Sequence, residues 1–423
     1  MTDPVRDQYE ALPYPAREPR DEAKRLIEGS PSHLLEVNHY VFAGRRDFTR
    51  PFRALVAGGG TGDATVMLAQ HLADRGCPAE IVHLDLSDAA IRVAAARAGA
   101  RGLGFVRFVA SSLEDLPGLG LGRFDYIDCC GVLHHLADPA AGLGILAAAL
   151  AEGGGMGLMV YGALGRTGVY HVQAMLRLLA PAESVAVRLD LARRLLRQLP
   201  PTNWFARNPA LGDHLLAGDA GLYDLLLHAR DRAFTVPEIV DLAAGAGLEI
   251  AAFVEPWRYR PESYLNDPAL LERLAGLDRI EAAGFAEQLA GNLKSHIFYV
   301  VAAGRAASAV ARPDDPSAVP VLRARLGEAS GGARDGAALP RVSKPGGGLT
   351  VRINGLEARF ALPPRAGPIL ARIDGRRSLR EIHDDLAAAG RGRLDWPTFK
   401  ADFDRVYALL NGLNRLFVAY PAG

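Results

Sequence analysis

The stretch that decides the fold follows a short apolar run and reads Leu55-Val56-Ala57-Gly58-Gly59-Gly60-Thr61-Gly62-Asp63. Glycine adopts backbone torsions that are closed to other residues and lets a ligand approach the main chain closely. A helix that begins at such a loop presents free N–H groups and the positive end of its dipole, which favour a carboxylate or a phosphate. The stretch therefore predicts a strand, a ligand-binding glycine loop and a helix in succession.

A carboxylate follows at the place expected for a group that binds ribose. Asp85 lies roughly 20 residues beyond Gly62, where the next apolar run ends. A dinucleotide loop of the form G-x-G-x-x-G that starts at Gly58 would need glycine at position 63, where Asp63 stands. This departure disfavours a nicotinamide-dependent dehydrogenase. A tight turn without any ligand is the alternative interpretation of the loop.

Short apolar runs alternate with longer amphipathic stretches on both sides of this unit. The predicted strands are Arg53–Ala57, Ile81–Leu84, Phe105–Val109, Phe124–Cys130, Met156–Tyr161, Leu248–Val254 and Ser295–Ala302. Helices are predicted at Asp63–Arg75, Asp88–Ala98 and Ala140–Ala151. Such alternation predicts an α/β fold, a doubly wound sheet with helices on both faces.

Composition and local signals divide the chain into four parts. We expect an N-terminal arm at 1–50, a sheet domain at 51–303 with a helical insertion at about 166–232, a flexible linker at 304–345 and an accessory module at 346–423. The linker is rich in Ala, Gly, Pro and Arg. In the module, Asn354-Gly355 is a strong hairpin signal and Ser378 with Glu381 forms a capping box. A hairpin with three short helices suggests a winged-helix-like module.

Three segments in order resemble the motifs of class I S-adenosylmethionine-dependent methyltransferases. These segments are Ala57–Gly62, Asp85–Ser87 and Phe124–Leu136. The resemblance covers roughly residues 50–162 and, more loosely, 233–303. It implies a seven-stranded Rossmann-like sheet whose last strand is antiparallel and lies beside the fifth, with S-adenosyl-L-methionine as the cofactor.

The resemblance also implies a set of cofactor-binding residues, namely Gly58, Gly60, Gly62, Asp85, Leu86, Ser112, Leu113 and Gly131. The glycines would line the methionine and ribose, Asp85 would bind the ribose hydroxyls and Leu86 would pack on the adenine. The family often has an acid two residues before the first loop glycine, and here that position is Val56. Backbone carbonyls or another segment must then contact the ammonium group of the cofactor. Asp63 is a weak candidate, because it also suits the start of a helix.

Methyl transfer from a sulfonium is an in-line displacement, which chiefly requires that nucleophile and methyl group be held close and collinear. A base is needed only if the nucleophile arrives protonated. His134 and His135 follow the fourth strand and are the candidate catalytic residues. The alternative is that one packs against the cofactor and the other caps a turn. No partner stands at zinc-ligand spacing, so no metal is predicted.

Two other groups of residues are weaker candidates. Aromatic and proline residues of the arm lie before the first strand, where related enzymes often have a lid over the cofactor. Alternatively, their packing only holds the arm in place. These residues are Tyr9, Pro13, Tyr14, Pro15 and the segment Asn38–Tyr40. In the insertion, we expect Asp213, His214 and His228 to be solvated helix residues rather than catalysts.

The composition excludes several classes of protein. Lysine and arginine number 48 against 48 acidic residues, so net charge gives no reason to expect nucleic acid as a partner. The three cysteines cannot build a disulfide framework. The first residues are too polar for a signal peptide, and no apolar run is long enough to span a membrane. A cytoplasmic protein is therefore expected.

The sequence leaves the methyl acceptor and the oligomeric state open. A protein side chain such as lysine or arginine is one possibility, because a small appended module could capture a polypeptide, and a small metabolite is the rival. A protein that binds the cofactor without catalysis is the alternative from another class.

Overall fold

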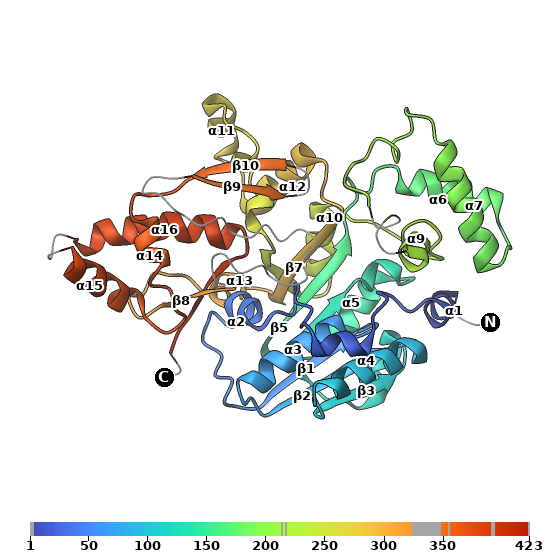
Figure 1. Cartoon of the computed structure of the whole chain (residues 1–423), viewed down its shortest axis with the longest axis horizontal. Helices are drawn as coiled ribbons and strands as arrows, with labels where there is room; N and C mark the ends of the chain where they lie inside the picture. The colour runs from blue at the N-terminus through green and yellow to red at the C-terminus, as the bar shows by residue number, and fades with distance from the viewer. Residues whose placement is uncertain are drawn as a thin grey trace.

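The computed structural model describes residues 4–212, 215, 218–323, 348–353, 356–390 and 394–421. Its centre is a sheet of seven strands with helices on both faces (Figure 1). The strands are β1 Phe52–Ala57, β2 Ala79–Asp85, β3 Val106–Ala110, β4 Phe124–Cys130, β5 Leu150–Tyr161, β6 Leu248–Phe253 and β7 Ser295–Ala302. Each predicted strand is present, although β5 begins six residues earlier than its apolar run suggests.

The strand order is β3-β2-β1-β4-β5-β7-β6, and β7 runs antiparallel between β5 and β6. This confirms the predicted doubly wound α/β fold, including the antiparallel last strand beside the fifth. The order reverses between β1 and β4, which pair in parallel with Val56 opposite Asp128. In sheets of this kind, ligands bind at the carboxyl ends of the strands where the order reverses.

Alternating side chains of β1 supply two separate cores, one on each face of the sheet. Leu55 packs among residues of the helices α5 and α10, whereas Ala54 packs among residues of α2 and α3. The helices of the sheet domain and arm are α1 Pro4–Ala11, η1 Pro19–Ala23, α2 Leu34–Val41, α3 Asp63–Asp74, α4 Asp88–Ala100, η2 Leu113–Leu119, η3 Leu133–His135, α5 Pro139–Ala148, α10 Val236–Gly245, η4 Pro256–Tyr259, η5 Pro261–Ser263, α11 Pro268–Leu274, α12 Arg279–Ala290 and α13 Ala306–Ala309. Among the described residues, no helix is both long and apolar enough to cross a membrane.

The segment between β5 and α10 is helical and has a core of its own. Its helices are α6 Val169–Leu179, α7 Val185–Gln198 and α9 Gly218–Leu226, which lie together at one end of the molecule (green in Figure 1). A buried ion pair of 2.6 Å joins Arg166 at the start of this segment to Asp231 at its end. Both ends of the segment are thereby held beside the sheet.

The C-terminal part combines two small antiparallel sheets with three helices, at the opposite end of the molecule (Figure 1). Its elements are β8 Val319–Leu322, β9 Gly348–Ile353, β10 Leu356–Ala361, α14 Ala366–Leu370, α15 Leu379–Ala389, α16 Trp396–Gly412 and β11 Leu416–Ala419. The two strands β9 and β10 pair as predicted, while the turn Asn354-Gly355 lies outside the described residues. The winged-helix-like assignment stays a prediction.

The expected linker needs correction at its beginning. Residues 306–309 form α13, and β8 pairs with β11, so this stretch is folded up to Arg323, whereas residues 324–347 lie outside the described ranges. Phe417 of β11 is buried in the same core as Tyr40 and Phe52. The composition suggested a linker because a short strand of small apolar residues resembles one until its partner, nearly 100 residues away, is known. The C-terminal part is therefore packed on the sheet domain.

Candidate functional site

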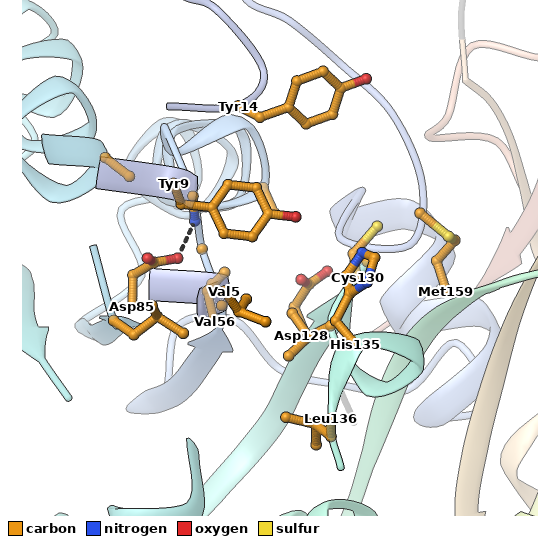
Figure 2. Close-up of a pocket in the computed structure, with 18 of the residues that line it drawn as sticks. Val5, Tyr9, Tyr14, Val56, Asp85, Asp128, Cys130, His135, Leu136 and Met159 are labelled. Carbon is orange, nitrogen blue, oxygen red and sulfur yellow. Dashed lines mark hydrogen bonds between the residues drawn. The ribbon is translucent and has the colours of Figure 1, made fainter. Parts of the chain in front are cut away.

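A cavity of about 310 Å³ lies at the carboxyl ends of the central strands, where the strand order reverses (Figure 2). Its size and mixed lining suit a small organic ligand. Its walls come from the glycine loop, the strand ends, the N-terminal arm and the insertion, and include Val5, Tyr9, Tyr14, Pro15, Val56, Gly58, Gly59, Gly60, Asp63, Asp85, Leu86, Ser112, Glu114, Asp128, Cys130, Gly131, Val132, His135, Met159, Tyr161, Asp224 and Arg230.

The glycine loop forms one wall because only glycine fits its backbone. Gly58 and Gly60 have φ of +69° and +52°, in the left-handed region. A Cβ at Gly58 would stand 2.2 Å from a methyl group of Val132, and a Cβ at Gly60 would stand 2.9 Å from the Tyr14 carbonyl oxygen. Side chains at these positions would therefore displace the neighbouring wall.

Asp85 stands at the end of β2, next to this loop. Its carboxylate accepts hydrogen bonds from the backbone N–H groups of Gly60 (2.7 Å) and Ser87 (2.9 Å). Burial raises its pKa, and these two hydrogen bonds oppose that rise. The carboxylate is therefore fixed to the loop and presented to the cavity, as expected of a group that binds two neighbouring hydroxyls.

The N-terminal arm crosses the outer side of the loop. Tyr9, Tyr14 and Pro15 line the cavity, and the Thr61 hydroxyl donates to the Pro15 carbonyl (2.7 Å). Asn38–Tyr40 lie elsewhere, in α2, where His39 contacts the C-terminal strand β11. Of the proposed lid residues, Tyr9, Tyr14 and Pro15 therefore lie at the cavity, whereas the segment Asn38–Tyr40 does not.

Asp63 is held by two arginines. Arg17 donates to both of its oxygens (2.8 and 3.1 Å from Nε), and the buried Arg97 donates from Nη1 at 2.7 Å. Burial alone would raise the pKa of Asp63, but these two guanidinium groups hold it below its usual value. Its charge is therefore already balanced within the protein, which makes it a poor ligand for an external ammonium group.

The structure brings together most of the predicted cofactor residues and one of the two histidines. Gly58, Gly60, Asp85, Leu86, Ser112, Gly131 and His135 line the cavity, whereas Gly62, Leu113 and His134 do not. Gly62 precedes α3 and its Cα faces Ala94, and Leu113 lies in the core under α5. His134 is fully buried and stacks on Tyr161 at 3.8 Å, with neither ring nitrogen hydrogen-bonded in the described part of the chain.

His135 is oriented so that one nitrogen remains an acceptor. Its Nδ1 donates to the Arg230 carbonyl oxygen at 2.7 Å, which leaves the lone pair on Nε2 in the neutral ring. Burial lowers its pKa to about 4, so the ring is neutral at pH 7. The chain thus presents a neutral imidazole at the cavity, adjacent to the insertion.

The insertion contributes a hydrogen-bonded cluster that sequence reasoning missed. Asp224 of α9 is buried and accepts from the hydroxyls of Tyr161 (2.8 Å) and Tyr9 (3.2 Å). His228 is buried as well and stacks on His135 at 3.7 Å, so the expectation of a solvated His228 is wrong. Its place depends on the fold of the insertion over the sheet, which no local pattern reveals. Asp213 and His214 lie outside the described residues.

Proximity alone would allow His135, Asp224 and His228 to share a metal ion, because their potential ligand atoms lie within 4.8 Å of one another. The hydrogen bonds argue otherwise. The backbone N–H of Arg230 donates to His228 Nδ1 at 3.0 Å, so the proton of the neutral ring sits on Nε2, 3.3 Å from the Tyr9 hydroxyl. A nitrogen that carries a proton has no lone pair for a metal, so the cluster suits proton donation and acceptance.

Two further acidic residues line the cavity. Glu114 lies two residues beyond Ser112, at the start of η2, so this part of the cavity wall carries an acid beside the serine. Asp128 of β4 is buried beside Val56, and its only sequence signal is a second charge, after Asp125, in a mostly apolar strand.

Comparison with known proteins places this site in a family. Residues 55–156 match a family model described as a methyltransferase domain. The chain is 41% identical over 93 residues to the ubiquinone/menaquinone biosynthesis C-methyltransferase UbiE of Methylobacterium nodulans, which covers 22% of this chain and 35% of that protein. It is 30% identical over 292 residues to an uncharacterized protein of Synechococcus sp. strain PCC 6301, which covers 66% of each chain.

The fold resembles that of PKMT2 from Rickettsia typhi, solved in complex with AdoHcy, with a TM-score of 0.65 and 15% identity. This similarity covers 92% of the present chain and 75% of that one, so it extends well beyond the sheet domain. The chain spans 66% and 35% of the lengths of the two relatives named above. The matched motifs, the strand order and the cavity at the reversal point agree: residues 55–156 form a methyltransferase domain, and the sheet has the fold of class I S-adenosylmethionine-dependent methyltransferases.

Proposed function

We propose that this protein transfers a methyl group from S-adenosyl-L-methionine to an amine on a protein side chain. The observation that carries the proposal is the cluster of Tyr9, Tyr161 and Asp224 at a cavity that also contains the glycine loop and Asp85. Bound there, the cofactor would supply a methyl group on a positively charged sulfur. The loop, Asp85 and Leu86 would hold its nucleoside, and Glu114 stands near enough to the same wall to accept from the adenine amino group.

The acceptor end favours a basic side chain. A buried carboxylate such as Asp224 attracts an ammonium group, and the two tyrosine hydroxyls that donate to it fix its orientation. The neutral His135 offers an acceptor nitrogen for an N–H of the same group. An amine that arrives protonated must lose one proton before it can attack, and the hydrogen-bonded cluster provides acceptors for that proton.

The insertion and the C-terminal part would receive the polypeptide. The insertion supplies Asp224 and His228 and has exposed apolar side chains, including Leu178 and Trp204. The fold shared with PKMT2 over nearly the whole chain supports a common architecture for such capture.

A labelling experiment tests the proposal. The purified protein is incubated with methyl-labelled S-adenosylmethionine and a cell extract, and the protein and small-molecule fractions are counted separately. Label in protein, located on an amine by mass spectrometry, is the expected result. Label only in small molecules would assign a metabolite as acceptor, and cofactor binding without label in any fraction would indicate a binding protein without catalysis.

A further inference from the structure

Four carboxylates at the cavity wall are buried or partly buried, and three of them are satisfied by the protein. Asp63 is paired with two arginines, Asp85 accepts from two backbone N–H groups, and Asp224 accepts from two tyrosine hydroxyls. Asp128 is the most buried of the four, at 2% exposed against 9% for Asp85 and 7% for Asp224, and no lysine, arginine or histidine of the described residues forms an ion pair with it.

The surroundings of Asp128 give it little compensation for burial. The Ser32 hydroxyl donates to Oδ2 at 2.6 Å and the backbone N–H of Cys130 also donates, but no other side chain among the described residues donates to the carboxylate. Burying a carboxylate without a cation costs free energy, and proteins retain such a group chiefly where a ligand or a metal ion neutralises its charge. Among the described residues, Asp128 belongs to no group of three potential metal ligands, and burial raises the pKa values of its strand neighbours Cys129 and Cys130, which keeps their thiols protonated.

The position of Asp128 indicates which charged group of a ligand would reach it. In the parallel pair of β1 and β4, Asp128 lies opposite Val56, two residues before the first loop glycine. Figure 2 shows its carboxylate on the side of the cavity that carries Cys130 and His135, away from Asp85. A cofactor whose nucleoside lies on Asp85 would extend its amino-acid part past the glycine loop toward this carboxylate.

Resting on the proposed function, we infer that Asp128 binds the α-ammonium group of the cofactor, so that β4 supplies the acid that β1 lacks. The side chain then acts as a binding residue for the amino-acid part of the ligand. It also makes the site selective for a cationic tail, because a ligand without the ammonium would leave the carboxylate buried and unpaired.

The test compares two ligands and three proteins by calorimetric titration at pH 8. The ligands are S-adenosylhomocysteine and its analogue in which hydrogen replaces the α-ammonium group. The proteins are the wild type, Asp128→Asn and Tyr126→Phe, the last being a control that alters a buried neighbour on the same strand without removing a charge. A charge-assisted hydrogen bond should make the wild type and the control prefer S-adenosylhomocysteine by roughly 10- to 100-fold, and Asp128→Asn should reduce this preference to a few-fold.

A second readout separates ligand binding from a structural role. Asp128→Asn removes a buried unpaired charge and keeps an acceptor for Ser32, so the ligand-free protein should melt at a higher temperature at pH 8. An unchanged ligand preference in Asp128→Asn would overturn the inference while leaving the proposed function intact. A wild type that binds neither ligand would contradict the proposed function itself.

Discussion

The Tyr161 hydroxyl, at the end of β5, donates a 2.8 Å hydrogen bond to Asp224, which lies 63 residues further along the chain in the insertion. This bond joins the sheet, whose strand ends carry the cofactor motifs, to the helical insertion. The acceptor end of the cavity is therefore built jointly by both, and substitutions there should affect methyl transfer separately from cofactor binding.

Asp224→Asn tests this separation. The amide keeps the shape of the side chain but loses the charge that attracts an ammonium group, so kcat/KM for the acceptor should fall by roughly 100-fold or more. The affinity for S-adenosylhomocysteine should stay within a few-fold of the wild type. Asp219→Asn, on the exposed side of the same helix, is the matched control and should change neither quantity. Equal activity of the Asp224 and Asp219 variants would remove Asp224 from the acceptor site.

Cofactor affinity should depend on pH through Asp128. Burial raises the pKa of this carboxyl to about 7, and only its ionised form can pair with an ammonium group. The affinity for S-adenosylhomocysteine should then be constant above about pH 8, about half its maximum near pH 7, and fall by about tenfold per pH unit below about pH 6. Among the groups that face Asp128, Tyr126 and Cys130 stay neutral because burial raises their pKa values, and His135 stays neutral because burial lowers its own.

Calorimetric titrations from pH 5.5 to 8.5 measure this dependence. In Asp128→Asn the dependence should disappear over the same range. A wild type whose affinity is flat across pH 7 would show that Asp128 does not bind the charged end of the ligand.

Arg97 should stabilise the fold and hold the N-terminal arm against α3. It is 1% exposed and bonds both Glu22 of η1 and Asp63 of α3 at 2.7 Å. Arg97→Met leaves the buried carboxylate of Glu22 and the partly buried carboxylate of Asp63 short of a partner, so the free energy of unfolding should fall by about 3 kcal/mol. Arg194→Met, which breaks an exposed pair with Asp190, should leave the denaturation midpoint nearly unchanged. Similar midpoints for the two variants would argue against the buried network as a stabilising element.

Phe417 tests whether the C-terminal part is an integral part of the fold. It is 1% exposed in a core shared with α2 and β1, so Phe417→Ala should cost about 3–5 kcal/mol in the free energy of unfolding. Phe285→Ala, at a site that is 37% exposed, is the control and should cost far less. Urea denaturation measures both. A small effect at Phe417 would mean that the C-terminal strand can detach without disturbing the sheet domain.

Local sequence patterns predicted those elements of the fold that a few consecutive residues determine. The strands of the sheet, the glycine loop and the capping box at Ser378 each depend on a few consecutive residues, and each is present. β5 was predicted too short because Gly153–Gly155 resemble a loop. Gly155 is nevertheless in the strand. It is glycine because a Cβ at this position would lie 2.6 Å from Val41 of α2, which covers this face of the sheet.

The missed features all depend on contacts between distant segments. Asp128 becomes informative only when β4 is known to pair with β1 in the register that sets it opposite Val56. From sequence alone His228 resembles a solvated helix residue, but it follows α9 and stacks on His135 once the insertion is folded, and β8 appears to be linker until β11 pairs with it. Parallel pairing and insertions are not encoded in local periodicity, because their partners are tens to hundreds of residues away.

Binding of the cofactor is the central claim, and Asp85 tests it most directly. Calorimetric titration of the wild type with S-adenosylhomocysteine and with NAD should show binding of the first and none of the second. Asp85→Ala should weaken the binding of S-adenosylhomocysteine by roughly 10- to 100-fold, because it removes hydrogen bonds from two ribose hydroxyls to a charged group. Tighter binding of NAD, or an Asp85→Ala variant with unaltered affinity for S-adenosylhomocysteine, would contradict the account.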